Sequence, residues 1–167
     1  MQPIPFGVGQ MKFTIERDKG GLNKIHPAFN LYYEKPYGNR VLILYGKKRA
    51  FNKTANYLIS LSKNKGSRES NMCVGKLRAN NENDKFTLYD NGENYSKLST
   101  FQMSQVRTEH GCFMYRYEPC NVGNIRKMVI VFPSVEPDPT QINAIPEEIL
   151  SQYNAAKDQP ETIYNFA

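Results

Sequence analysis

The chain has 167 residues, of which 40% are hydrophobic, and this length and composition suit a single soluble globular unit with a core of its own. No run of 18 or more apolar residues is present, which excludes a membrane-spanning helix, and the first ten residues lack the charged and apolar parts of a secretory signal. The net charge of +6 is concentrated in residues 35–85, which hold 12 Lys and Arg against 3 Asp and Glu, whereas residues 133–167 hold 1 against 6.

Short runs of alternating or continuous apolar residues, separated by turn residues, predict strands along most of the chain. The turn Asp90-Asn91-Gly92 is a strong signal for a tight reversal, and Pro133 closes the last run. In chain order, the predicted strands lie within residues 11–16, 40–46, 56–62, 71–79, 85–92, 112–118 and 127–132.

One amphipathic helix is predicted over residues 146–157. Pro146 suits the first helical position, and the two glutamates that follow favour a helix N-terminus. Ile149, Leu150 and Tyr153 fall on one face of this helix. Many short strands with few helices predict a mainly β fold, an antiparallel sandwich or barrel.

The three cysteines are odd in number and form no C-x-x-C pair, so the sequence predicts neither a disulfide framework nor a structural metal site. A reducing cytoplasmic or nuclear compartment fits this cysteine usage, and no cofactor motif is present.

The stretch "VGKLRAN" at residues 74–80 carries two cations on one predicted strand. Lys76 and Arg78 should share a face about 7 Å apart and point outward, while Leu77 on the other face anchors the strand. Such a pair suits a group bearing two phosphates, because arginine offers a bidentate fork and lysine a compact charge. A solvated basic strand edge is the alternative interpretation of the pair taken alone.

Several longer sequence motifs are found along nearly the whole chain. They are "IERDKGGLNK" at 15–24, "NYLIS" at 56–60, "VGKLRAN" followed by "KFTLYDNG" at 74–92, and "IRKMVIVFP" at 125–133. In their order and spacing the chain resembles the tubby-like C-terminal domain family. The resemblance implies an antiparallel β-barrel around a central apolar helix, for which the sequence has no counterpart. We therefore expect residues 11–167 to be an incomplete tubby-like domain, a fragment preceded by an N-terminal extension at 1–10, with exposed strand edges that favour self-association. A variant barrel that fills its centre differently is the alternative interpretation.

The resemblance also implies a function. Tubby-like domains are peripheral membrane modules, not enzymes, that bind phosphatidylinositol 4,5-bisphosphate at the inner face of the plasma membrane and act as adapters delivering membrane-protein cargo, including to cilia. At the positions that match the family's motifs, the resemblance implies four head-group ligands, Asn56, Lys76, Arg78 and Arg126. Residues 112–124, ahead of Arg126, depart from the family pattern, which leaves the register of Arg126 open by one or two positions. Lys47, Lys48, Arg49 and Lys53 suit secondary contacts with anionic lipid, and a solvated basic loop is the alternative interpretation of these residues.

Two other classes of function compete with this interpretation. The basic segment also suits a nucleic-acid backbone, and aromatic residues interleave with its cations, although no recognition helix, zinc finger or RNP word is present. An enzyme is disfavoured because His26 and His110 stand without a phosphate loop, a metal motif or a nucleophile elbow. Cys112 is expected to be a small buried thiol rather than a nucleophile.

Overall fold

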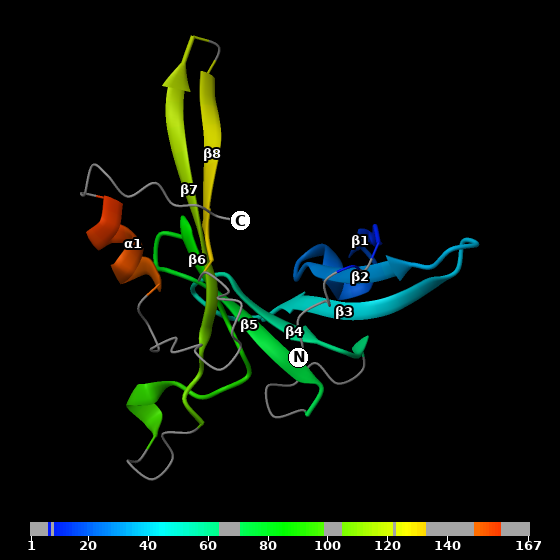
Figure 1. The fold of residues 1–167 in the computed structure, drawn as a ribbon. Coiled ribbons are helices and arrows are strands. Elements are labelled where there is room, and N and C mark those ends of the chain that lie inside the picture. Colours follow the sequence, from blue (N-terminus) through cyan, green and yellow to red (C-terminus); the bar gives the residue numbers. More distant parts are fainter. Residues whose placement is uncertain are drawn as a thin grey trace. The chain divides into compact units, whose positions relative to one another are not determined.

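The computed structural model describes residues 7, 9–63, 71–98, 105–121, 123–132 and 149–157 (Figure 1). Strands dominate these residues, which confirms the mainly β prediction, and every strand pair with a described register is antiparallel. The elements are β1 (Lys12–Asp18), β2 (Ala28–Glu34), β3 (Arg40–Lys48), β4 (Asn56–Ser60), β5 (Cys73–Ala79), β6 (Lys85–Tyr89), β7 (Glu109–Cys120), β8 (Gly123–Val131), α1 (Ile149–Lys157) and the short 3-10 helices η1 (Gly21–Lys24) and η3 (Tyr95–Lys97).

Each of the predicted runs contains a strand, and β2 is the strand that sequence reasoning missed. One side of β2 is buried through Ala28 and Asn30, a small residue and a polar one, rather than through large apolar side chains. Large apolar residues, Phe29, Leu31 and Tyr33, alternate on the other, half-buried side, so a period of two is present in this segment although it marks the less buried side.

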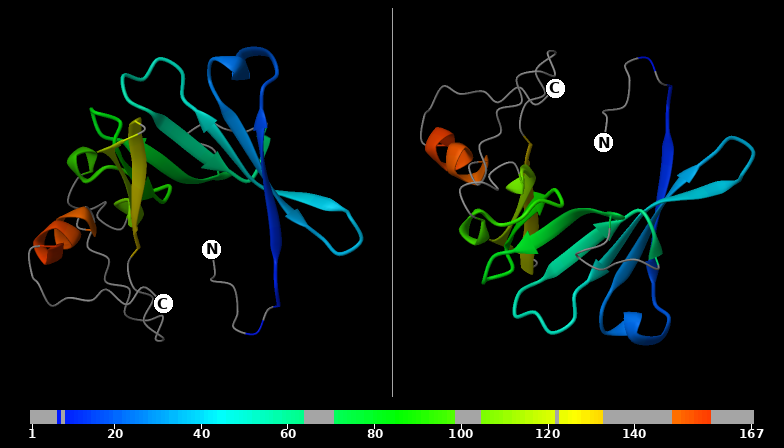
Figure 2. Two further views of the ribbon diagram at one scale, coloured as in Figure 1. Left: turned by 90° about the horizontal axis from the view of Figure 1, so that it is seen from above. Right: turned by 90° about the horizontal axis from the view of Figure 1, so that it is seen from below.

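The chain divides into two compact units, residues 1–50 with 57–74 and residues 51–56 with 75–167. Within the first unit the hydrogen-bonded order is β1-β2-β3-β4, and its buried apolar residues are Ala28, Tyr45, Leu58 and Cys73. Within the second unit the order is β5-β6-β7-β8, and α1 lies beside β7 and β8 in all views (Figures 1 and 2).

The core of the second unit forms where α1 packs on β7 and β8. Cys112, Met114 and Val131 are almost fully buried there and meet Ile149, with Leu150 and Tyr153 packed around them. The predicted helical face is thus confirmed over residues 149–157, while residues 146–148 lie outside the described residues. The expected burial of the Cys112 thiol is also confirmed, since none of that residue is exposed.

Two methionines on the β7–β8 pair allow a matched test of this core. Met114 is 3% exposed and Met128 is 52% exposed. We expect Met114→Ala to lower the free energy of unfolding by about 2–5 kcal/mol, because it removes buried methylenes and leaves a cavity. Met128→Ala should change it by less than about 0.5 kcal/mol. Urea titration followed by circular dichroism measures both, and equal losses would contradict the packing of α1 on this strand pair.

Candidate functional site

Lys76 of β5 is buried, with 2% of the residue exposed, so the prediction that its cation points outward is wrong. Its Nζ donates hydrogen bonds of 2.9 Å to the backbone carbonyls of Asn91 and Gly92. These carbonyls replace water around the ammonium, which is what allows a charged group to be buried. Leu77, the predicted anchor of the strand, is only half-buried.

The turn that receives Lys76, Asp90-Asn91-Gly92, does not join two strands in the tight reversal predicted, because β6 ends at Tyr89 and β7 begins only at Glu109. It is instead tied to the segment ahead of β7. One carboxylate oxygen of Asp90 accepts hydrogen bonds from the backbone N–H groups of Gly92, at 2.8 Å, and of Thr108, at 3.0 Å. The backbone N–H of Arg107 donates to the carbonyl of Glu93 at 2.8 Å. A Cβ atom on Gly92 would lie 2.5 Å from Cα of Arg107, so only glycine permits this close approach of two backbones.

Gly92→Ala tests that approach. We expect a loss of about 1–3 kcal/mol in the free energy of unfolding, because the added methyl group meets backbone atoms that cannot rotate away. Gly46→Ala in β3 is the matched control, since nothing lies within 4 Å of a Cβ at that position. Thermal unfolding of both variants measures the difference, and equal stability would show that the two segments do not touch as described.

Tyr89 of β6 lies at the centre of the cationic residues. It pairs with Lys76 across β5 and β6 and is 9% exposed. The guanidinium carbon of Arg107 lies 4.1 Å from the centroid of its ring, and that of Arg78 lies 5.9 Å away. Arg107 is itself 7% exposed. Three cationic side chains therefore gather at one tyrosine, two of them in cation–π contact with its ring.

Arg107 was missed by sequence reasoning. It lies just before β7, outside any strand, and no periodic pattern or run of charge marks it. It joins Lys76 and Arg78 only because the segment 105–108 is hydrogen-bonded to the Asp90–Glu93 turn.

Asn56, the first residue of β4, lies alongside Arg78. The backbone N–H of Ala79 donates to the carbonyl of Ala55 at 2.9 Å, which sets the neighbouring residues Asn56 and Arg78 next to each other. The side-chain amide of Asn56 donates to the hydroxyl oxygen of Thr54 at 3.3 Å. The structure thus brings together three of the four residues that the resemblance matched.

Arg126 of β8 is the fourth, and the structure does not bring it to the others. Strand pairing from β5 to β8 places Arg78 and Val131 on the same face of the sheet. Because side chains alternate along a strand, Arg126, five residues before Val131, projects from the opposite face. Its guanidinium carbon lies 3.9 Å from the ring centroid of Tyr115. A head-group role for Arg126 stays a prediction from the resemblance.

The secondary basic residues are distributed over both units. Lys47 and Arg49 are exposed and Lys48 is half-buried in the first unit, while Lys53 is exposed in the second. Their contact with lipid stays a prediction.

Helix α1 borders the face that carries Lys76 and Arg78. It packs on Cys112, Met114 and Val131, which share that face by register. The carboxylate of Glu109 accepts a hydrogen bond of 3.3 Å from the backbone N–H of Ile149. Two carboxylates near the cations, Asp90 and Glu109, are therefore engaged by backbone N–H groups.

Burial raises the pKa of the Tyr89 hydroxyl, an effect that the charge of Arg107 partly opposes. Burial likewise raises the pKa of the Cys112 thiol.

Among the described residues, no cluster of His, Cys, Asp and Glu is able to hold a metal ion. Of the helices in these residues, none has the length and apolar character needed to cross a membrane.

The raised pKa of Tyr89 predicts a loss of stability in alkali. The folded chain keeps this proton at a pH where the unfolded chain, with an ordinary tyrosine pKa of about 10, has released it. The stabilisation that Tyr89 gives by keeping its proton is fully present below about pH 10. It is lost as the pH rises through the pKa of Tyr89 in the folded chain. Tyr89→Phe should weaken this decline without abolishing it, because burial also raises the pKa of Tyr45.

The measurement is the free energy of unfolding against pH for the wild type, Tyr89→Phe and Tyr37→Phe, the last at a fully exposed position. An unchanged slope in Tyr89→Phe would contradict the burial of this hydroxyl.

The fold and site define the class of this protein as an antiparallel β domain that carries a partly buried cationic cluster. Residues 1–165 match the sequence profile of the Tub family, and the chain belongs to that family. It is 36% identical over 157 residues to human Tubby-related protein 2, covering 89% of this chain and 30% of that protein. It is 31% identical over 157 residues to mouse Tubby-related protein 3 (90% and 34%) and 32% identical over 143 residues to Protein king tubby of Drosophila yakuba (85% and 31%). The chain thus spans about a third of the length of these relatives.

Proposed function

We propose that the cluster around Tyr89 binds the bisphosphorylated head group of phosphatidylinositol 4,5-bisphosphate, and that the chain is a peripheral membrane module without enzymatic activity. The observation that supports this best is the gathering of Lys76, Arg78 and Arg107 at one tyrosine. Membership of the Tub family, whose resemblance implied this ligand, supports it independently.

The burial of the cluster favours discrimination between anions. Two unit charges 4 Å apart interact by about 1 kcal/mol in bulk water and by about 4 kcal/mol at an effective dielectric constant near 20. Lys76 and Arg107 are almost completely buried, so their charges are less screened than those of exposed lysines. Half-buried Arg78 supplies the fork that binds a phosphate directly, with the amide of Asn56 beside it.

Lys76 acts in this proposal by holding the turn and by contributing positive potential from behind Arg78. Its truncation would leave two carbonyls without their donor, so Lys76→Ala confounds binding with stability. Arg78 is the better position for a test, because its side chain is only half-buried.

The proposed location is the inner face of the plasma membrane, where the chain tethers a larger protein that acts as an adapter for membrane-protein cargo. The exposed cations Lys47, Arg49 and Lys53 would add diffuse attraction to the leaflet. The thiol of Cys112 is fully buried, so in this proposal it is not a nucleophile that reaches a substrate.

The test is co-sedimentation with vesicles that contain either phosphatidylinositol 4,5-bisphosphate or phosphatidylserine at equal surface charge. We expect the wild type to prefer the bisphosphate. Arg78→Gln should lose about 1.5–3 kcal/mol of that preference, the usual contribution of a hydrogen bond to a charged group, or about tenfold or more in affinity. Arg107→Gln should lose a comparable amount, with circular dichroism to confirm folding.

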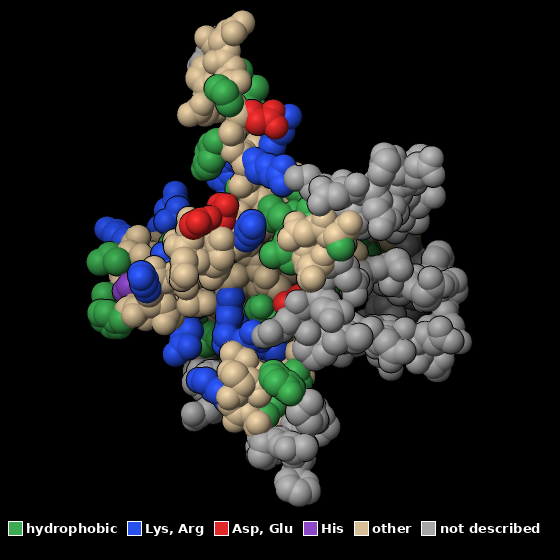
Figure 3. Space-filling view, turned by 90° about the vertical axis from the view of Figure 1, so that its left-hand side faces the viewer, with side chains coloured by type: hydrophobic (Ala, Val, Ile, Leu, Met, Phe, Trp, Pro, Cys, Tyr) green, Lys and Arg blue, Asp and Glu red, His purple; other side chains and the backbone are tan. Residues whose placement is uncertain are grey.

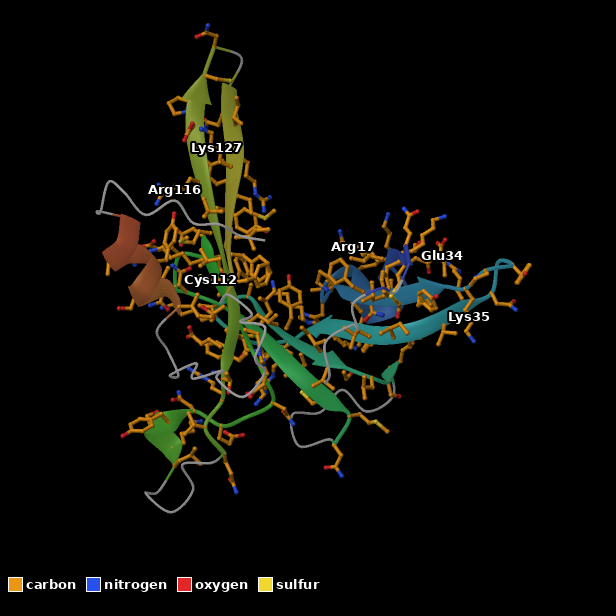
Figure 4. The ribbon with its side chains drawn as sticks, viewed as in Figure 1. Arg17, Glu34, Lys35, Cys112, Arg116 and Lys127 are labelled. Atoms are coloured by element: carbon orange, nitrogen blue, oxygen red, sulfur yellow. The ribbon has the colours of Figure 1, made fainter. Side chains whose placement is uncertain are left out.

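Two control variants remove the same charge elsewhere. Lys35→Gln, at an exposed position after β2 (Figure 4), should keep the preference. Arg126→Gln should keep it if only the described cluster binds the head group, and should lose it if the resemblance assigned Arg126 correctly. Equal sedimentation with both lipids by a folded chain would overturn the proposal. Binding to DNA with a steep dependence on salt would then favour the nucleic-acid alternative.

A further inference from the structure

The β7–β8 hairpin continues as a two-stranded ribbon beyond the strand that supports its base. Pairing between β6 and β7 ends at Lys85 and Met114, followed by one more hydrogen bond, of 2.8 Å, from Tyr115 N–H to the carbonyl of Asp84. Beyond these contacts, β7 and β8 pair only with each other among the described residues. We call residues 116–120 and 123–128 the distal ribbon (Figure 1).

Apolar and basic side chains share the surface of the distal ribbon (Figure 3). Tyr117 is 66% exposed, and Ile125 and Met128 are each 52% exposed. The exposed charged residues are Arg116, Glu118, Arg126 and Lys127, and Glu118 forms an ion pair with Lys127. Figure 4 shows Arg116 and Lys127 on the ribbon, away from Cys112 at the base of the hairpin. The ribbon is thus apolar in part and carries three cations against one carboxylate.

This combination fits the interfacial layer of an anionic membrane, because the net positive charge of the ribbon complements anionic lipid. A two-stranded hairpin alone is marginally stable in water, so a ribbon of this kind gains from contact with another surface. At a membrane surface, tyrosine places its ring at the level of the head groups, and long basic side chains reach the lipid phosphates while apolar neighbours enter the leaflet.

We propose that the distal ribbon is a second membrane contact, which inserts Tyr117 and Met128, on the face that also carries Arg126, into the interface of an anionic leaflet. This inference rests on the proposed membrane function but not on the head-group site. The cluster at Tyr89 would select the lipid, while the ribbon would bind any anionic leaflet and lengthen the time that the domain stays on the membrane.

The chain contains no tryptophan, so a single introduced tryptophan reports on one position. Tyr117→Trp is read by fluorescence with vesicles of phosphatidylcholine and phosphatidylserine, without phosphoinositide, with ordinary or brominated acyl chains. We expect emission to shift to shorter wavelength on binding and to be quenched by the brominated lipid. Tyr95→Trp in η3, where the tyrosine is 57% exposed, is the matched control and should show neither change.

Charge is tested in the Tyr117→Trp background. Arg126→Gln removes the cation on the face of Tyr117, and at about 1 kcal/mol for a basic residue near an anionic surface the affinity should fall about fivefold. Arg116→Gln, on the opposite face, is the matched control and should change the affinity less. Equal affinity of Arg126→Gln and the parent would contradict the assigned role of Arg126.

The remaining outcomes separate this inference from the head-group proposal. Unshifted emission of Tyr117→Trp on vesicles that sediment the protein would overturn the ribbon contact and leave head-group selection standing. A shift that grows with protein concentration in the absence of vesicles would also overturn it, because a second copy would then cover the ribbon. Quenching without any preference for the bisphosphate would support the ribbon and reject the head-group site.

Discussion

The buried ammonium of Lys76 is the constraint on which the arrangement of the cationic cluster depends. A charge with 2% exposure needs acceptors, and it finds them in the carbonyls of Asn91 and Gly92. The turn that offers them must therefore lie against β5. Asp90 of the same turn accepts a hydrogen bond from Thr108, so the segment ahead of β7 is held against this turn. Arg107, in that segment, therefore lies over the ring of Tyr89. One polar requirement thus positions residues from three parts of the chain.

The same arrangement concentrates positive charge where screening by water is weakest. Two carboxylates that flank the cluster along the chain, Asp90 and Glu109, accept hydrogen bonds from backbone N–H groups. Glu109 in particular binds the first residue of α1, so the helix borders the face on which Arg78 lies. In the proposed function, this cluster would bind a compact, multiply charged anion through charge-assisted hydrogen bonds.

The two proposed membrane contacts differ in their physical basis. The cluster at Tyr89 depends on packed neighbours and a satisfied buried charge, so its geometry is set by the fold. The distal ribbon depends on exposed side chains of two strands that no third described strand supports. Arg126 belongs to the ribbon by register and faces Tyr115, which separates it from the residues that the family resemblance grouped with it. Selection and adhesion would then reside in different parts of one unit.

The sequence by itself determined the elements and the family. Alternation and turn residues predicted seven of the eight strands in the described residues, and the face formed by Ile149, Leu150 and Tyr153 predicted the helix, because these signals are local. The missed strand, β2, also alternates through Phe29, Leu31 and Tyr33, but there the apolar residues mark the less buried side. Only the tertiary structure decided that Lys76 is buried, that Arg107 joins the cluster and that Arg126 projects from the other face. These outcomes depend on strand register and on the carbonyls that accept from Lys76, which lie 15 and 16 residues away in the chain. The local periodicity of hydrophobic residues predicts neither of them.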